Sequence, residues 1–116
     1  MHYMTVRHHH AAGATLRTGS NSVGWAENVW CLFGCSRVGA AIQHYRNGVA
    51  LDTDISVGGL IDPESNAARD LVIGTRFTKN QNWFNGRVHR PRVWARALAA
   101  SEHACIFEKE RGWFGL

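Results

Sequence analysis

Apolar and polar residues alternate along much of the chain, and this pattern predicts strands. Residues 14–18 (ATLRT) and 41–46 (AIQHYR) alternate with a period of two, which is typical of half-buried strands. Apolar-rich runs at 29–37, 71–76 and 87–96 indicate further strands, and a short one is expected at 3–7 within an N-terminal arm, residues 1–12. Residues 13–116 then form a single domain. Short strands separated by turn signals favour an antiparallel sandwich.

Turn and cap residues mark the boundaries of these elements. Asn47-Gly48 directly follows one alternating run, and Asn-Gly between strand-like residues is the strongest short hairpin signal. The partner strand is expected over residues 49–52, and residues 58–69 form a long surface loop. One helix is predicted over 101–111, with Ser101 as its N-cap and Gly112 at its end.

Composition adds a basic charge to this picture. The chain has 116 residues, a single domain's worth, and a net charge of +4. Arginine dominates the basic residues, and arginine suits acidic partners such as nucleic acid or anionic glycans as well as ordinary surface ion pairs. Specific nucleic-acid binding is not expected, because no known motif interleaves these arginines with stacking aromatics.

No apolar run in the sequence is long enough to cross a bilayer, and the N-terminus lacks the apolar core of a signal peptide. No membrane association is therefore expected. The location stays open, and a virion or the cell exterior, reached through a partner, remains compatible with the sequence.

The cysteines and histidines do not form a recognisable site. Cys31 and Cys35 lie four residues apart in a predicted strand, a span of about 13 Å, whereas bridged Cα atoms lie within about 7 Å. With Cys105 the count is odd, so the sequence predicts three small buried apolar groups rather than a disulfide framework. The run His8-His9-His10 is assigned to the arm. No metal or cofactor is expected.

Four landmarks together resemble the laminin-G-like, concanavalin-A-like jelly-roll family. They are the C-terminal stretch 84–102 (FNGRVHRPRVWARALAASE), the hairpin 45–49 (YRNGV), the strand 71–76 (LVIGTR), and Trp30 ahead of the hairpin. They occur in the family's order and spacing over about residues 29–108. The resemblance implies an all-β antiparallel jelly-roll sandwich with one short C-terminal helix.

The chain departs from the family pattern in two places. The family often has an acidic residue after the glycine of the last strand, but this chain has His89-Arg90-Pro91, which puts a calcium site there in doubt. Only about 28 residues precede Trp30, so the N-terminal strands are reduced or missing. A sandwich that lacks strands exposes an open edge. We therefore expect another copy or a partner protein to cover it.

Two loops and one basic stretch are the candidate sites. Amides next to a large aromatic are typical of sugar binding. The alternative is that each tryptophan packs beneath its own loop. The candidate ligand-binding residues are Asn80, Gln81, Asn82 and Trp83 in one loop, and Asn21 and Trp25 in the other. The candidate interface residues are Arg90, Arg92, Trp113 and Phe114.

These observations indicate two candidate functions and argue against a third. The first is a non-catalytic recognition or adhesion module that binds carbohydrate or a protein surface through its loops. The alternative is a structural assembly protein of a virion, in a capsid decoration or a tail, that completes its reduced sandwich with neighbouring subunits. An enzyme is not expected, because a glycosidase needs paired carboxylates about 5–9 Å apart and Asp52 and Asp54 are the nearest match.

Overall fold

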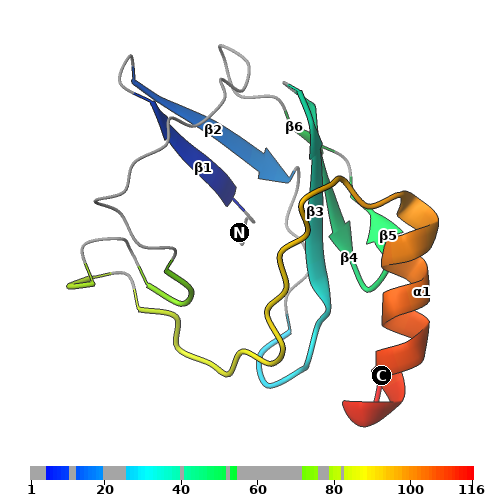
Figure 1. Cartoon of the computed structure of the whole chain (residues 1–116). Coiled ribbons are helices and arrows are strands. Elements are labelled where there is room, and N and C mark those ends of the chain that lie inside the picture. Colours follow the sequence, from blue (N-terminus) through cyan, green and yellow to red (C-terminus); the bar gives the residue numbers. More distant parts are fainter. Residues whose placement is uncertain are drawn as a thin grey trace.

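Two small antiparallel sheets and one helix make up the regular structure of the described residues (Figure 1). The computed structural model describes residues 5–10, 13–19, 26–39, 41–51, 53–54, 72–75, 79–81 and 83–116. Within 5–10, 13–19 and 53–54 the description is limited to the backbone.

The central sheet contains β3 (Phe33–Val38), β4 (Ala41–Arg46) and β5 (Val49–Ala50), in that order. The predicted Asn-Gly hairpin between β4 and β5 is confirmed. Asn47 and Gly48 have φ values of 49° and 78°, the two positive values that a tight hairpin turn requires. The Asn47 side chain also accepts a hydrogen bond from the Leu32 N–H at 3.0 Å, which ties the turn to the chain ahead of β3.

The helix α1 (Ala100–Glu110) packs on one face of this sheet. The His103 ring stacks on Tyr45 with 3.8 Å between centroids, and it fills the space beside the Cα of Gly34. Further along, Gly48 lies so close to Ala104 that a Cβ on the glycine would approach the Ala104 Cα to 2.8 Å. Two glycines therefore let the helix come close to the sheet.

The second sheet contains β1 (Thr5–His10), β2 (Gly13–Gly19) and β6 (Thr53–Asp54). β1 overlaps the short strand expected at residues 3–7, and β2 contains the one expected at 14–18. β4 contacts both β2 and β6, so the two sheets meet (Figure 1). Whether an N-terminal arm is mobile stays a prediction.

The buried side chains cluster around β4. Side chains of successive strand residues point to opposite faces, so Tyr45 faces α1 while Ile42 and His44 point away from it. His44 is fully buried, and neither of its ring nitrogens has a hydrogen-bond partner among the described residues. This burial lowers the pKa of His44.

The prediction of an all-β jelly-roll sandwich is wrong. The described residues contain two three-stranded sheets, and the strands expected at 71–76 and 87–96 do not form where the structure describes them, because residues 72–75 and 87–96 are irregular. Backbone geometry explains this, because Gly74 and Arg90 have φ values of 84° and 49°, which interrupt an extended strand. Pro91 also removes an N–H that a sheet ladder would use.

The C-terminal helix is confirmed, but its ends differ from the prediction. The N-cap is Ala99 rather than Ser101, and the Glu102 carboxylate accepts the Ala99 N–H at 2.8 Å. After α1 the chain continues through Gly112 in the 3₁₀ turn η1 (Arg111–Trp113). Of the two glycines after α1, it is Gly115 that has a positive φ, and it follows that turn.

Cys31 and Cys35 do not form a disulfide, as predicted, and all three cysteines are free thiols. Their predicted burial is wrong: Cys35 and Cys105 are exposed, and Cys31 is half-buried. Cys35 lies on β3, at the edge of the central sheet, where one side of the strand has no neighbouring strand within the sheet.

Within the described ranges, no helix is long and apolar enough to cross a membrane.

Candidate functional site

Residues 83–99 form an irregular segment, here called the strap, that leads into α1 (Figure 1). Between residues 85 and 97, no backbone group of the strap makes a backbone–backbone hydrogen bond to any described residue. Side chains therefore hold the strap in place, and its exposed side chains make up the candidate site.

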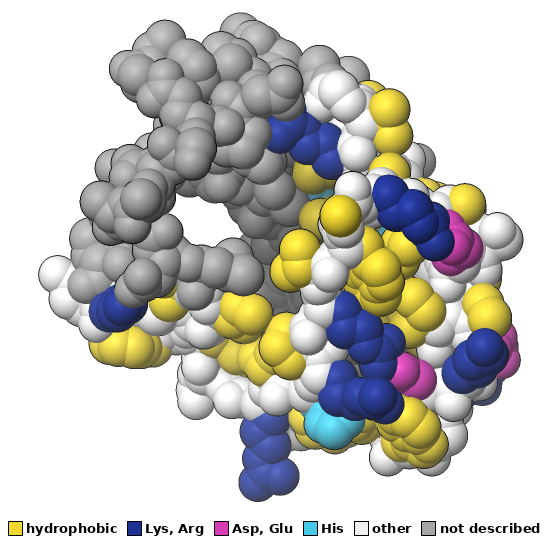
Figure 2. Space-filling model, in the orientation of Figure 1, with side chains coloured by type: hydrophobic (Ala, Val, Ile, Leu, Met, Phe, Trp, Pro, Cys, Tyr) yellow, Lys and Arg dark blue, Asp and Glu magenta, His cyan; other side chains and the backbone are white. Residues whose placement is uncertain are grey.

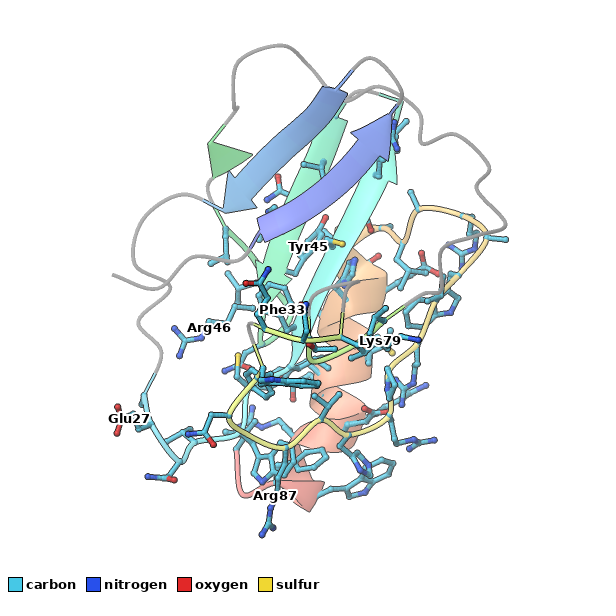
Figure 3. The ribbon with its side chains drawn as sticks, turned by 90° about the vertical axis from the view of Figure 1, so that its left-hand side faces the viewer. Glu27, Phe33, Tyr45, Arg46, Lys79 and Arg87 are labelled. Atoms are coloured by element: carbon cyan, nitrogen blue, oxygen red, sulfur yellow. The ribbon has the colours of Figure 1, made fainter. Side chains whose placement is uncertain are left out.

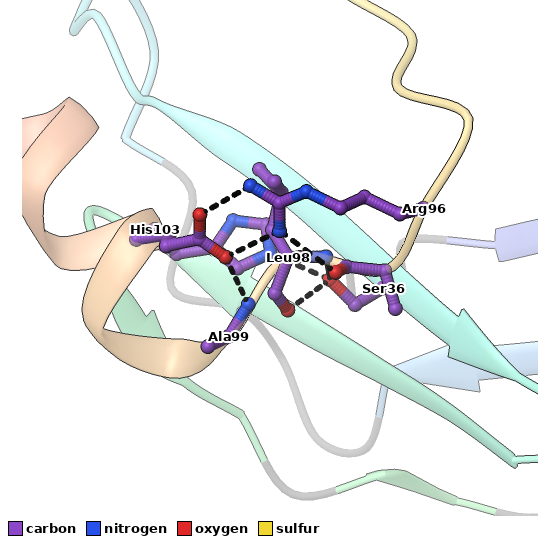
Figure 4. Close-up of polar contacts among 7 residues, drawn as sticks. Ser36, Arg96, Leu98, Ala99 and His103 are labelled. Carbon is purple, nitrogen blue, oxygen red and sulfur yellow. Dashed lines mark hydrogen bonds and ion pairs between the residues drawn. The ribbon is translucent and has the colours of Figure 1, made fainter.

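One anchor lies at the C-terminal end of the strap (Figure 4). The Ser36 hydroxyl on β3 donates to the Leu98 carbonyl at 2.7 Å and accepts the Leu98 N–H at 3.1 Å. The His103 Nε2 lies 2.9 Å from the same oxygen. Because the hydroxyl proton points to Leu98, His103 donates from Nε2 in this arrangement. Burial lowers the pKa of His103 and so favours the neutral ring, which can make this bond only as the tautomer with its proton on Nε2.

A second anchor joins the strap to the first turn of α1. The Arg96 guanidinium donates to both carboxylate oxygens of Glu102, at 2.7 and 2.5 Å. Together with the hydrogen bond from the Ala99 N–H, this pair lowers the pKa of Glu102 to about 2. The same carboxylate thus caps the helix and holds the strap.

A third anchor surrounds Glu110, at the last residue of α1. Arg92 forms a short ion pair with Glu110, and Arg90 lies 3.7 Å from the same carboxylate. The Arg90 guanidinium also lies over the Trp113 ring, 5.1 Å from its centroid. These contacts hold Arg90 in its positive-φ conformation, which is rarely adopted by a residue with a side chain.

The C-terminal tail, residues 112–116, also contacts the strap. The Phe114 ring lies 4.8 Å from Trp30 and 5.2 Å from His89, measured between centroids. The tail thereby connects the strap to the segment that precedes β3.

The strap exposes a row of large apolar side chains. Val93 is 80% exposed and Trp83 is 65% exposed, which leaves most of each side chain in solvent. The members of this set, here called the apolar row, are Trp83, Phe84, Val88, Val93 and Trp94. Figure 2 shows apolar and arginine side chains side by side on one face of the molecule. Exposed apolar groups gathered on one segment are typical of an interaction surface.

Arg87 is the arginine of the strap for which the described residues provide no partner. It forms no hydrogen bond or ion pair with any residue in the described part of the chain, and its side chain points away from the ribbon (Figure 3). By contrast, Arg92 and Arg96 are paired with Glu110 and Glu102.

The structure brings together part of the predicted site. The expected interface residues Arg90, Arg92, Trp113 and Phe114 gather at the end of α1 through contacts within the chain. In the loop predicted to bind sugar, Asn80, Gln81 and Trp83 are exposed. Asn82, and Asn21 with Trp25 from the second loop, lie outside the described residues.

Other members of the surface were not anticipated from the sequence. The sequence predicts Val88 and Val93 in a strand, where one face is buried, and Phe84 in the turn before it, and nothing in their spacing signals exposure. Ser36 and His103 are 67 positions apart, so no local pattern could have paired them.

The Ser36–His103 pair has the elements of an activated hydroxyl, but its contacts favour a structural role. Leu98 occupies the hydroxyl as both donor and acceptor. The neighbouring carboxylate of Glu102 binds Arg96 and the Ala99 N–H. No group of three or more His, Cys, Asp or Glu side chains is positioned to hold a metal ion within the described ranges.

Comparison with known proteins leaves the family open. No protein-family model, no curated protein and no solved structure matches the chain. The resemblance to laminin-G-like domains therefore stays a prediction from the sequence.

Proposed function

We propose that the chain is a non-catalytic recognition module that binds another protein through the apolar row of the strap. The observation that carries this proposal is the exposure of Trp83, Phe84 and Val93 on a segment whose anchors do not involve these three side chains. Ser36, Arg96 and Arg92 hold the strap, so the row is not needed to fix it. Covering such side chains contributes about 25 cal/mol per Å² of apolar surface.

Site-specific photo-crosslinking tests this proposal. A photoreactive phenylalanine analogue replaces Val93 in the full chain, and a matched chain carries it at Val38, which is 71% exposed at the end of β3. Both chains are irradiated in extract of the source cells. We expect one discrete crosslinked protein from position 93 and none from position 38. Equal crosslinking from both positions, or none from position 93, would contradict the proposal.

Carbohydrate binding at Trp83 is the second candidate. The exposed ring is preceded closely in the chain by Asn80 and Gln81, which are also exposed, and a ring with neighbouring amides suits a sugar face and its hydroxyls. A glycan array probed with the full chain and with Trp83→Ala tests it. Binding that the variant loses would favour this candidate, and absence of binding would remove it.

The virion-assembly alternative stays a prediction from the sequence. In an assembly of identical subunits the apolar row would contact a neighbouring copy. The charge that remains on the strap argues against direct strap-to-strap contact, because Arg87 and the exposed part of Arg90 would face the same groups of a second copy.

A further inference from the structure

The distribution of charge along the strap indicates the chemistry of its partner. Residues 71–101 contain no Asp or Glu, while the strap contains Arg87, Arg90, Arg92 and Arg96. The carboxylates that compensate this charge come from α1, where Glu102 binds Arg96 and Glu110 binds Arg92. Arg90 shares Glu110 at the longer distance of 3.7 Å and remains about half exposed.

After this pairing, little free positive charge remains beside the apolar row. Arg87 is exposed and unpaired among the described residues, and Arg90 is only partly neutralised. A binding track for single-stranded nucleic acid follows the backbone with a positively charged groove. Three of the five side chains of the apolar row are aromatic and could stack on bases, but the described strap offers only one free cation and one shared cation to follow a phosphate backbone.

From this balance we infer that the partner is a segment of another protein that carries apolar side chains and carboxylates together. The apolar groups cover the apolar row, and the carboxylates meet Arg87 and the exposed part of Arg90. Charge complementarity of this kind directs association and excludes partners of like charge, including a second copy of the strap. The inference rests on the proposed function and adds the chemical class of the partner.

Fluorescence anisotropy with the full chain tests the inference on defined probes. The probe is a labelled short peptide that alternates leucine and glutamate. Two matched peptides replace glutamate by lysine or leucine by serine, and a labelled oligothymidine is the fourth probe. We expect the leucine–glutamate peptide to bind at least about tenfold more tightly than the other three, with an affinity that falls as salt rises.

Charge-reversal variants assign the effect to the strap. Arg87→Glu should weaken binding of the leucine–glutamate peptide by about tenfold or more, because attraction becomes repulsion. Lys109→Glu makes the same charge change at an exposed position on α1 and should alter the affinity by less than about twofold. Arg87→Ala should give an intermediate affinity.

The outcomes separate this inference from the proposed function. Equal binding of the glutamate and lysine peptides, or absence of peptide binding, would overturn the inference while crosslinking from position 93 still supports protein binding. Tightest binding of oligothymidine with loss in Arg87→Glu would overturn the inference in favour of nucleic acid. Absence of crosslinking from position 93 would overturn both.

Discussion

At the residue scale, the Glu102 side chain combines two structural roles. It caps α1 through the Ala99 N–H and holds the strap through Arg96. A residue with two such roles is expected to make folding sensitive to its charge. Because Glu102 and Arg96 are exposed, the salt bridge itself contributes less than a buried pair would.

Acid unfolding should report this role. The pKa of Glu102 is lowered from an ordinary 4.5 to about 2, so its contribution to stability is complete above pH 4.5 and is lost as the pH falls towards 2. Glu102→Gln should be less stable at neutral pH and should lose less stability across that window. Urea unfolding at several pH values measures both effects. Glu108→Gln, at an exposed pair with Arg111, is the control. If the free energy of unfolding of Glu102→Gln falls with pH as steeply as that of the original chain, the assignment is contradicted.

The burial of His44 predicts a second pH dependence of stability, at higher pH. Burial lowers its pKa from 6.5, so the unfolded state binds the proton first and stability falls as the pH drops below 6.5. His44→Leu should reduce this fall and should leave the free energy of unfolding at neutral pH unchanged or raise it by about 1 kcal/mol. The pKa of His103 is lowered in the same direction, so part of the fall remains.

The same unfolding series checks the assignment with a histidine outside the core. His89→Gln replaces an exposed histidine and is the control for the loss of an imidazole elsewhere in the chain. An unaltered fall in His44→Leu would show that His44 does not remain neutral in the folded state.

At the element scale, the sequence predicted the parts that local chemistry determines. Asn47-Gly48 requires positive φ at two positions, and the structure has a hairpin there. The C-terminal helix lies within one residue of its predicted bounds, although its N-cap is Ala99 and not the predicted Ser101. Residues 87–96 have the composition of a strand, but Arg92 binds the Glu110 carboxylate on α1, 18 positions along the chain. The alternation of apolar and polar residues alone could not reveal that binding to α1 competes with strand formation.

Close approach of the β4–β5 turn to α1 gives a prediction at this scale. Gly48→Ala would strain a residue at φ 78° and press a Cβ against the Ala104 backbone, so we expect a loss of about 1–3 kcal/mol in the free energy of unfolding. Gly112→Ala meets no atom within 4 Å and should change stability by no more than about 1 kcal/mol. Urea unfolding compares the two variants, and equal costs would contradict the packing described.

At the scale of the whole molecule, the candidate site depends on contacts that the sequence does not display. The arginines of the strap were predicted as a basic stripe, but α1 neutralises Arg92 and Arg96, and Arg87 has no partner among the described residues. Val88, Val93 and Trp94 of the apolar row were expected inside a sheet, and they lie in solvent because the strap has no sheet partner among the described residues. The resulting surface is more apolar and less basic than the sequence indicates.

This surface predicts the behaviour of the pure chain in solution. Like charge on the straps disfavours their direct pairing, so light scattering after size exclusion should give a monomer near 12.9 kDa in moderate salt. An oligomer that dissociates in Val93→Asp would show that a second copy covers the apolar row instead.

Hydroxyl-radical footprinting tests the central claim most directly, because it measures whether the apolar row is covered when the partner is present. The full chain is labelled in isolation and in extract of its source cells, and oxidation is compared at Trp83, Phe84 and Val93, with Val38 and Val49 as equally exposed references. We predict strong labelling of all five in isolation and protection of the first three in the extract. Labelling of Trp83, Phe84 and Val93 that stays as high as that of the two references would contradict the account.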